Sequence, residues 1–303
     1  MNNRAILIVV GILWGCQPSP RQELRDRDEL AGQPRLPTGA RLDPAGASFE
    51  VGSMPLAMVP SPDGNHVVIL LNGWREQGIQ VVNRFTGAIV QTVLQPAAFL
   101  GVAFSPDGRT LYASGGNQDV VYRYSWSDAR ATLVDSLVLA RKEPRKSGTR
   151  YPAGVAVSRD GRRLYVAENL ADSLAVVDLE TGRVTARFPT ERYPYGVVVA
   201  PDGMVYVSAW GGSTVSMFSP SADGSIASAG RLAVGRHPSA MVLNQDGTRL
   251  YVASGSTDRV AVVDTKTRRM LLHLLDPPPA GPGEGSTPNA LALSADGTRL
   301  FVA

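Results

Sequence analysis

Residues 151–167 read YPAGVAVSRDGRRLYVA, and this stretch sets the pattern for most of the chain. An alternating apolar run leads into Asp160-Gly161, and a second short apolar run leaves it. Glycine accepts a positive φ, and an aspartate side chain accepts hydrogen bonds from the backbone of its own turn. The stretch therefore predicts a β-hairpin with its turn at Asp160-Gly161.

The same turn recurs along the chain after residue 48, with successive copies 42–53 residues apart. Each of the first five copies is followed by a strand ending in a Tyr-Val-Ala-like triplet, a polar loop, a third strand, a Thr-Gly-like turn and a fourth strand. A period in the forties with four short strands is typical of propeller blades. The sequence thus predicts an all-β fold, a β-propeller of four-stranded antiparallel blades. The copies are Asp63-Gly64, Asp107-Gly108, Asp160-Gly161, Asp202-Gly203, Asp246-Gly247 and Asp296-Gly297.

The repeats predict five complete blades and a partial sixth within residues 48–303. The sixth begins near Pro288 and has two strands before the sequence stops at Ala303, so we expect a C-terminally truncated propeller. Residues 49–52, FEVG, align with residues 232–235, LAVG, and are expected to form a closing fourth strand. Both six and seven blades stay open on this evidence. The complete blades begin near Pro55, Leu100, Pro152, Pro194 and Pro238.

The N-terminus reads as an export signal. Arg4 precedes an apolar run too short to span a bilayer, and the segment ends in Leu-Trp-Gly-Cys at Cys16, which resembles a bacterial lipobox. We expect a signal peptide over residues 1–15, lipidation of Cys16, and a Pro-rich disordered tether over residues 16–47. An ordinary secretory signal with an incidental cysteine is the alternative. The expected location is the bacterial cell envelope, periplasmic or on the outer membrane, with membrane attachment through the lipid.

Charge is nearly balanced, with 30 Lys and Arg against 27 Asp and Glu. The signs are interspersed, so no nucleic-acid partner is expected. The basic run over residues 141–150 falls in the longest repeat and reads as a solvated insertion.

The repeats resemble the YVTN-type β-propeller family, and the resemblance covers residues 48–303. It implies seven blades. The arrangement is more particularly similar to bacterial extracytoplasmic proteins in which such a propeller precedes an alkaline-phosphatase-like phosphoesterase domain; that domain lies outside this sequence. The matching residues in the third repeat are Pro152, Gly154, Asp160, Gly161, Tyr165, Val166, Val176, Asp178 and Gly182.

Candidate ligand-binding residues gather on one predicted face, made of the links between blades and the loops between second and third strands. Three links read Arg-aromatic-Pro, and a ring of guanidinium groups suits a small anionic ligand. Packing of these side chains between blades explains their recurrence equally well. Trp74 and Trp210 occur once each in such loops and are candidates for stacking on a ligand. The full set is Asn72, Trp74, Asn117, Arg150, Glu168, Asn169, Arg192, Tyr193, Trp210, Arg236 and His237.

No catalytic motif stands out. The turn aspartates, and Asp119, Asp172 and Asp258 seven residues after equivalent tyrosines, are expected to shape loops. The three histidines lack metal-ligand spacing, so no catalytic residue, metal or cofactor is expected. The sequence therefore favours a binding or interaction scaffold for a small anionic ligand or a protein. A lactonase-like hydrolase in the propeller funnel is the alternative, and Glu168 with Asn72, Asn117 and Asn169 is the nearest approach to its metal site.

Overall fold

The computed structural model describes residues 47–143, 146–276 and 285–303. Contacts divide the chain into two units, Met1–Phe49 and Glu50–Ala303, and every described strand lies in the second. The predicted signal peptide, Cys16 and all but the last residue of the predicted tether lie outside the described residues. Within the part that is described, no helix is long and apolar enough to cross a membrane.

Five sheets have four strands each, and a sixth has two. Neighbouring strands are antiparallel and follow chain order, which confirms the predicted fold class and the five complete blades. The strands are β1 (Pro55–Pro60), β2 (His66–Asn72), β3 (Gln77–Asn83), β4 (Ile89–Leu94), β5 (Val102–Phe104), β6 (Thr110–Ser114), β7 (Val120–Ser127), β8 (Arg130–Val138), β9 (Pro152–Val157), β10 (Arg163–Glu168), β11 (Ser173–Asp178), β12 (Arg183–Pro189), β13 (Pro194–Val199), β14 (Val205–Ala209), β15 (Thr214–Pro220), β16 (Ile226–Ala233), β17 (Pro238–Leu243), β18 (Arg249–Ser254), β19 (Arg259–Asp264), β20 (Arg269–Leu275), β21 (Leu291–Leu293) and β22 (Leu300–Val302).

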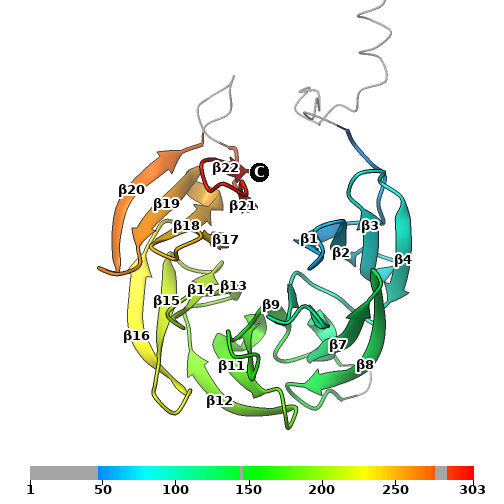
Figure 1. Cartoon of the computed structure of the whole chain (residues 1–303). Helices are drawn as coiled ribbons and strands as arrows, with labels where there is room; N and C mark the ends of the chain where they lie inside the picture. The colour runs from blue at the N-terminus through cyan, green and yellow to red at the C-terminus, as the bar shows by residue number, and fades with distance from the viewer. Residues whose placement is uncertain (1–46, 144–145, 277–284) are drawn as a thin grey trace, which may run out of the picture. The chain divides into compact units, whose positions relative to one another are not determined.

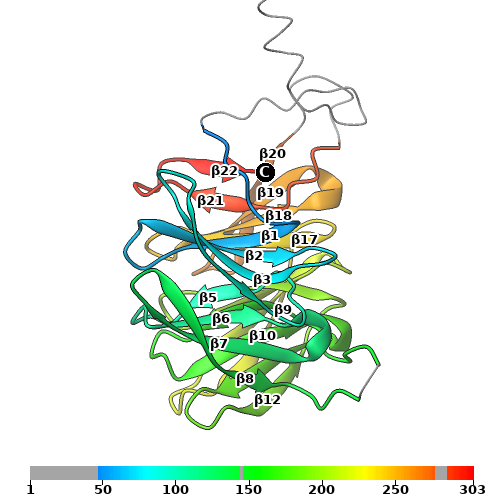
Figure 2. The same ribbon diagram turned by 90° about the vertical axis from the view of Figure 1, so that its right-hand side faces the viewer.

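The blades lie around a common axis. The first strand of each blade is the innermost, as β1, β9, β13 and β17 show in Figure 1, while β4, β8, β12, β16 and β20 form the outer side. Consecutive inner strands contact each other from β1 through β5, β9, β13 and β17 to β21. The view turned by 90° shows β5, β6, β7 and β8 crossing their blade in chain order (Figure 2). This up-and-down order brings all second-to-third-strand loops and all blade links to one face, which we call the link face.

The hairpin turns form as the sequence predicts. In the third blade the Ser158 hydroxyl donates to Asp160 Oδ1 at 2.5 Å, and the same oxygen accepts the Arg162 N–H at 3.0 Å. Gly161 has φ +70°, the left-handed conformation that glycine adopts without steric cost. The hydroxyl of Ser105 and that of Ser294 bond their turn aspartates in the same way. A Ser-x-Asp-Gly turn thus fixes the register between the first two strands.

The core lies between blades because alternate residues of a strand point to opposite sides. In β10, Leu164 and Val166 are fully buried and pack with Leu137 of the preceding blade. The residue between them, Tyr165, packs with Val205 of the following blade. Each middle strand therefore contributes to two interfaces, and neighbouring blades hold each other in place.

One expectation about the blades is wrong. Residues 49–52 form no strand in the described structure. A strand needs a neighbour with free backbone groups, and the sixth sheet has only β21 and β22 in the described residues. The Gly52 N–H donates instead to the side chain of Gln80 in β3, at 3.0 Å.

Candidate functional site

The link face is shaped by three short 3-10 turns that carry an aspartate at their ends. The turns are η1 (Gly116–Gln118), η2 (Asn169–Ala171) and η3 (Gly255–Thr257), and each is followed by Asp119, Asp172 or Asp258 in the left-handed conformation, with φ of 56°, 49° and 46°. Aspartate tolerates this conformation because its short side chain bonds locally.

These aspartates hold the links between blades. The Asp119 carboxylate is fully buried and accepts the backbone N–H groups of Thr149, Arg150 and Tyr151 at 2.7, 2.8 and 2.8 Å. The carboxylate of Asp172 likewise accepts the Tyr193 N–H at 2.9 Å. Asp258 accepts the N–H of Thr287 at 2.9 Å, and these backbone hydrogen bonds lower the pKa of its carboxyl. The predicted loop-forming role of these residues is what their contacts provide.

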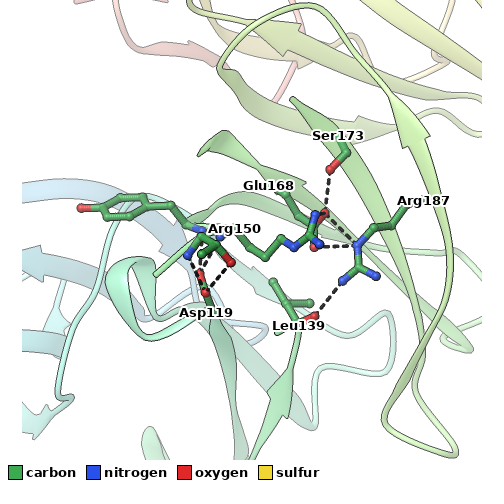
Figure 3. A network of polar contacts seen from close by, with 8 residues as sticks. Asp119, Leu139, Arg150, Glu168, Ser173 and Arg187 are labelled. Atoms are coloured by element: carbon green, nitrogen blue, oxygen red, sulfur yellow. Dashed lines mark hydrogen bonds and ion pairs between the residues drawn. The ribbon is translucent and has the colours of Figure 1, made fainter. Parts of the chain in front are cut away.

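Glu168 lies at the end of β10 and is completely buried. Its carboxylate accepts the Ser173 hydroxyl at 2.6 Å and the Arg187 Nε–H at 3.0 and 3.1 Å, and it lies 3.7 Å from Arg150 Nη1 (Figure 3). Arg187 also donates to the Leu139 carbonyl at 2.7 Å. The charge of Glu168 is therefore neutralised inside the protein, and its oxygens are occupied by arginine and serine.

Arg187 of this network was not among the residues singled out from the sequence. Arg187 in β12 donates to the carbonyl of one blade link, and Arg231 in β16 donates to the Thr190 carbonyl of the next link at 2.8 Å. Aligning the fourth strands, RFPT at 187–190 with RLAV at 231–234, reveals the pair. The recurrence of this arginine is therefore visible in the sequence, but it identifies a residue that holds the link between blades.

An aromatic cavity of about 260 Å³ opens on the link face. The Tyr195 ring lies 6.3 Å from Phe99 and 5.7 Å from Trp210, between ring centroids. Burial raises the pKa of the Tyr195 hydroxyl, an effect that the neighbouring Asn289 amide partly offsets. Trp210 is in turn stacked on His237 at 5.4 Å with 19° between the ring planes. The aromatic cavity is lined by Phe99, Asn169, Tyr193, Tyr195, Trp210 and Asn289.

A second hollow, the amide cavity, has a volume of about 420 Å³. It adjoins the aromatic cavity, because the Tyr151 ring on its wall packs edge-to-face on Phe99 at 5.1 Å and because Asn169 and Leu170 line one cavity each. Its lining residues are Asn72, Gln77, Pro96, Ala97, Ala98, Asn117, Gln118, Ser147, Tyr151 and Leu170.

The structure places the predicted site residues in three groups. Asn169, Tyr193 and Trp210 line the aromatic cavity, and Asn72 and Asn117 line the amide cavity. The remaining six lie outside the cavity linings. Glu168 and Arg150 form an ion pair, Arg192 lies 5.2 Å from the Tyr193 ring centroid, His237 stacks on Trp210, Trp74 is 96% exposed, and Arg236 is exposed.

No arginine of the three Arg-aromatic-Pro links therefore lines either cavity. Among the described residues there is also no group of three or more His, Cys, Asp or Glu side chains placed to hold a metal ion. The neutral side chains of the links, rather than their guanidinium groups, border the two hollows.

Several lining residues were missed from the sequence. Tyr195 occupies the second position of its inner strand, where the neighbouring blades have Ala153 and Ser239. Phe99 stands in the link that precedes β5. The sequence feature that could have identified Tyr195 as a lining residue is a bulky side chain at a position where the other repeats have a small one. Gln77, Gln118 and Asn289 carried no such signal, since polar residues are common in the loops and at the strand ends of all blades.

Comparisons with known proteins agree with this fold. Residues 142–256 match the family model described as SMP-30/Gluconolactonase/LRE-like region. The chain is 34% identical over 127 residues to the seven-bladed beta-propeller protein Rv1057 of Mycobacterium tuberculosis. That match covers 39% of this chain and 31% of the relative, so the chain aligns with about a third of that protein's length.

Solved structures of low sequence identity share the fold. A putative 6-phosphogluconolactonase from Bacteroides uniformis has a TM-score of 0.67 at 17% identity, covering 88% of this chain and 81% of that one. Virginiamycin B lyase from Staphylococcus aureus has a TM-score of 0.63 at 15% identity, covering 82% and 77%. The periplasmic gluconolactonase of Pseudomonas aeruginosa has a TM-score of 0.55 at 20% identity, covering 73% and 69%. The chain is thus a β-propeller that resembles, over part of its length, the SMP-30/gluconolactonase group and a seven-bladed mycobacterial propeller.

Proposed function

We propose that this propeller is a binding module that takes a small, uncharged molecule with a flat ring face into the aromatic cavity. The observation that carries the proposal is the lining itself: Phe99, Tyr195 and Trp210 present rings, and the other three residues are two asparagines and a tyrosine. Ligand sites are typically concave and mostly apolar, with a few polar groups that fix orientation. The lining favours an uncharged ligand over the anionic one expected from the link arginines.

Stacking provides the affinity in this proposal, and the amides provide orientation. An aromatic ring held against an indole gains about 0.5–1.5 kcal/mol beyond the area it buries, and the apolar face of a saturated sugar ring gains from the area that it buries. The Trp210 indole is already held in place by its ring contacts with Tyr195 and His237, so little of its freedom is lost on binding. The Asn169 Nδ2 already donates to the Pro194 carbonyl at 3.0 Å, so this side chain offers its Oδ1 as an acceptor at the edge, and Asn289 adds a second amide.

Replacing Trp210 tests the proposal. The full chain is titrated with glucose, N-acetylglucosamine and p-nitrophenyl β-glucoside, and binding is followed by saturation-transfer NMR. Trp210→Ala is expected to weaken binding of whichever ring compound binds by about five- to tenfold, the equivalent of about 1–1.4 kcal/mol. Phe85→Ala is the matched control, because Phe85 is an exposed aromatic in a β3–β4 turn on the opposite face. Equal weakening by both variants, or binding of citrate or phosphate in preference to the ring compounds, contradicts the proposal.

A lactone hydrolase of the propeller funnel is the second candidate, and the match of residues 142–256 to the SMP-30/gluconolactonase model favours it. An uncharged sugar lactone is a ring compound that suits the same cavity. Glu168 is buried against arginines and is poorly placed as an open metal ligand. Hydrolysis of δ-gluconolactone by the purified chain, with and without added divalent cation, separates the candidates: turnover abolished by Trp210→Ala supports the hydrolase, and binding without turnover supports the binding module.

Three further proposals rest on the sequence. We propose that the chain is related to the YVTN-type propellers and that the full protein has seven blades. Cys16 attaches it to the membrane of the bacterial envelope as a lipoprotein, and the propeller serves a phosphoesterase domain of the same protein. The mass of the N-terminal peptide from exported protein tests the anchor, since acylation of Cys16 adds the mass of the acyl chains and Cys16→Ser removes it.

A further inference from the structure

The aromatic and amide cavities differ in chemistry but share a wall. Phe99 belongs to the aromatic cavity and Tyr151 to the amide cavity, and their rings are in edge-to-face contact at 5.1 Å. Asn169 and Leu170, consecutive residues of η2, line one cavity each. A ligand longer than one ring that enters the aromatic cavity therefore meets the amide cavity next.

The amide cavity is polar without being charged. Four side-chain amides border it, from Asn72, Gln77, Asn117 and Gln118. The Asn117 Oδ1 accepts the Gly148 N–H, and the Gln77 Oε1 accepts the Ala98 N–H, both at 2.7 Å. These bonds fix the two side chains by their oxygens and leave their NH₂ groups as donors.

The other two amides can bind a ligand through both their carbonyl oxygen and their NH₂ group. Within the part of the chain that the structure describes, no hydrogen bond engages the side chain of Asn72 or Gln118, and both residues are half-buried. Each therefore offers a carbonyl acceptor and two N–H donors at the cavity. Hydroxyl groups, which both donate and accept, are the ligand groups that such a wall satisfies best.

The lack of charged side chains in the two cavity linings narrows the class of ligand further. Neither cavity is lined by an Asp, Glu, Lys, Arg or His side chain, so neither an anion nor a cation finds its counter-charge there. A sugar combines an apolar ring face with a rim of hydroxyl groups and no charge. Trp74, 96% exposed, lies in the loop between the lining residues Asn72 and Gln77.

We infer that the two cavities form one elongated site for a neutral oligosaccharide. One sugar ring stacks in the aromatic cavity against Trp210, and the adjoining unit is hydrogen-bonded by the amides of Asn72 and Gln118. This inference rests on the proposed binding function and adds the ligand class and the second half of the site.

Chain length of the ligand is the property to vary. The full chain is titrated calorimetrically with N-acetylglucosamine and its β-1,4-linked di-, tri- and tetrasaccharides, and in parallel with glucose and the matching cello-oligosaccharides. In at least one series, affinity is expected to rise about tenfold from the monosaccharide to the trisaccharide as the amide cavity becomes occupied. Asn72→Ala and Gln118→Ala are each expected to remove most of that rise and to leave the monosaccharide affinity within about twofold.

A matched control and a second readout separate the two cavities. Asn65→Ala removes an exposed amide from a turn on the opposite face and leaves all affinities unchanged. Monosaccharides are expected to change the emission of Trp210, and Trp74→Phe is expected to remove only the additional change in emission that oligosaccharides produce. Thermal melting of each variant verifies that it is folded.

The possible outcomes distinguish failure of the elongated site from failure of the proposed binding function. One result would overturn the elongated site and leave the aromatic site supported. In that result monosaccharides and oligosaccharides bind with equal affinity, Trp210→Ala loses binding, and Asn72→Ala and Gln118→Ala have no effect on affinity. Binding of p-nitrophenyl β-glucoside without binding of any free sugar overturns the sugar class. Absence of binding by every probe overturns both proposals.

Discussion

Glu168 is a residue whose loss should destabilise the fold strongly. Its buried carboxylate faces Arg187 and Arg150 and accepts the Ser173 hydroxyl. Removing one member of a buried ion pair leaves the other charge without compensation, at a cost of about 3–5 kcal/mol. Both arginines are about one-third exposed, so Glu168→Ala is expected to lower the free energy of unfolding by about 3 kcal/mol, at the lower end of that range. Urea denaturation followed by far-UV circular dichroism measures the change.

Glu180→Ala is the matched control, because Glu180 is exposed in the β11–β12 turn of the same blade. Its stability should stay within about 0.5 kcal/mol of the parent. A Glu168→Ala variant as stable as this control would show that the network contributes nothing and that the carboxylate is held there for another reason.

Residues that recur from repeat to repeat hold the blades together, whereas residues that occur once can line a cavity. This difference explains which site residues could be predicted from the sequence. The link arginines recur, and in the structure Arg150 pairs with Glu168 and Arg192 lies over Tyr193. Trp210 occurs once, and it lines the aromatic cavity. Tyr195 escaped notice because an aromatic in an inner strand looks like core. Only its neighbours in space, which the sequence does not give, show that it borders a hollow.

At the scale of the element, the Ser-x-Asp-Gly turns should make stability depend on pH in the acid range. Serine hydroxyls and backbone N–H groups lower the pKa of Asp107, Asp160 and Asp296, the last to about 2. A carboxyl whose pKa is lowered by folding stabilises the protein above its unfolded value of 3.8, and that stability is lost as the pH falls through the folded value. The melting temperature should therefore fall as the pH drops from about 4 to about 2.

Replacing the turn serines tests the cause. A variant with Ser105→Ala, Ser158→Ala and Ser294→Ala lacks the hydroxyls that lower these pKa values and should show a shallower loss of melting temperature with acid. Ser127→Ala with Ser228→Ala changes exposed serines in β7 and β16 and should keep the parent's slope. Parallel pH profiles for all three proteins would rule out the turns as the source.

Neighbouring inner strands approach each other closely at a glycine. The closeness of each approach predicts how much an alanine at that position lowers the stability of the fold. A Cβ added to Gly101 would lie 2.1 Å from the Ala153 carbonyl oxygen, and one added to Gly154 would lie 2.4 Å from that of Tyr195. At Gly196 the nearest atoms are 3.1 Å away. Overpacking of this kind costs about 1–3 kcal/mol, so alanine at Gly101 or Gly154 should destabilise the fold more than alanine at Gly196.

Urea unfolding of the three single variants measures this order. Alanine is found naturally at the equivalent position of the fifth blade, Ala240, so the spacing between inner strands does vary around the propeller. Equal stabilities for Gly101→Ala and Gly196→Ala would mean that the inner strands move apart freely and that the close approach is not needed.

The strands themselves were well predicted because turn chemistry and two-residue alternation act locally. Asp160-Gly161 predicts its hairpin without any knowledge of the rest of the molecule. The expected strand over residues 49–52 failed for the opposite reason. Its formation depends on a partner strand far along the chain, and alignment to residues 232–235 says nothing about whether that partner is present beside it.

At the scale of the whole molecule, repetition explains both the success of the fold prediction and the limit of the site prediction. Each blade buries its two faces against its neighbours, so the same pattern must recur from blade to blade. A binding cavity on the link face arises where the blades differ, at Trp210 and Tyr195 in the fourth blade and at the amides of the first and second. These differences come from several blades, and only the assembled arc brings them together.

A crystal structure of the full chain with bound N-acetylglucosamine oligosaccharide would show directly whether the two cavities form the sugar site. We predict a sugar ring stacked on the Trp210 indole in the aromatic cavity, with the next unit directed past Tyr151 toward Asn72 and Gln118. Sugar bound on another face, or an empty aromatic cavity beside an anion held by Arg192 and Arg236, would contradict it.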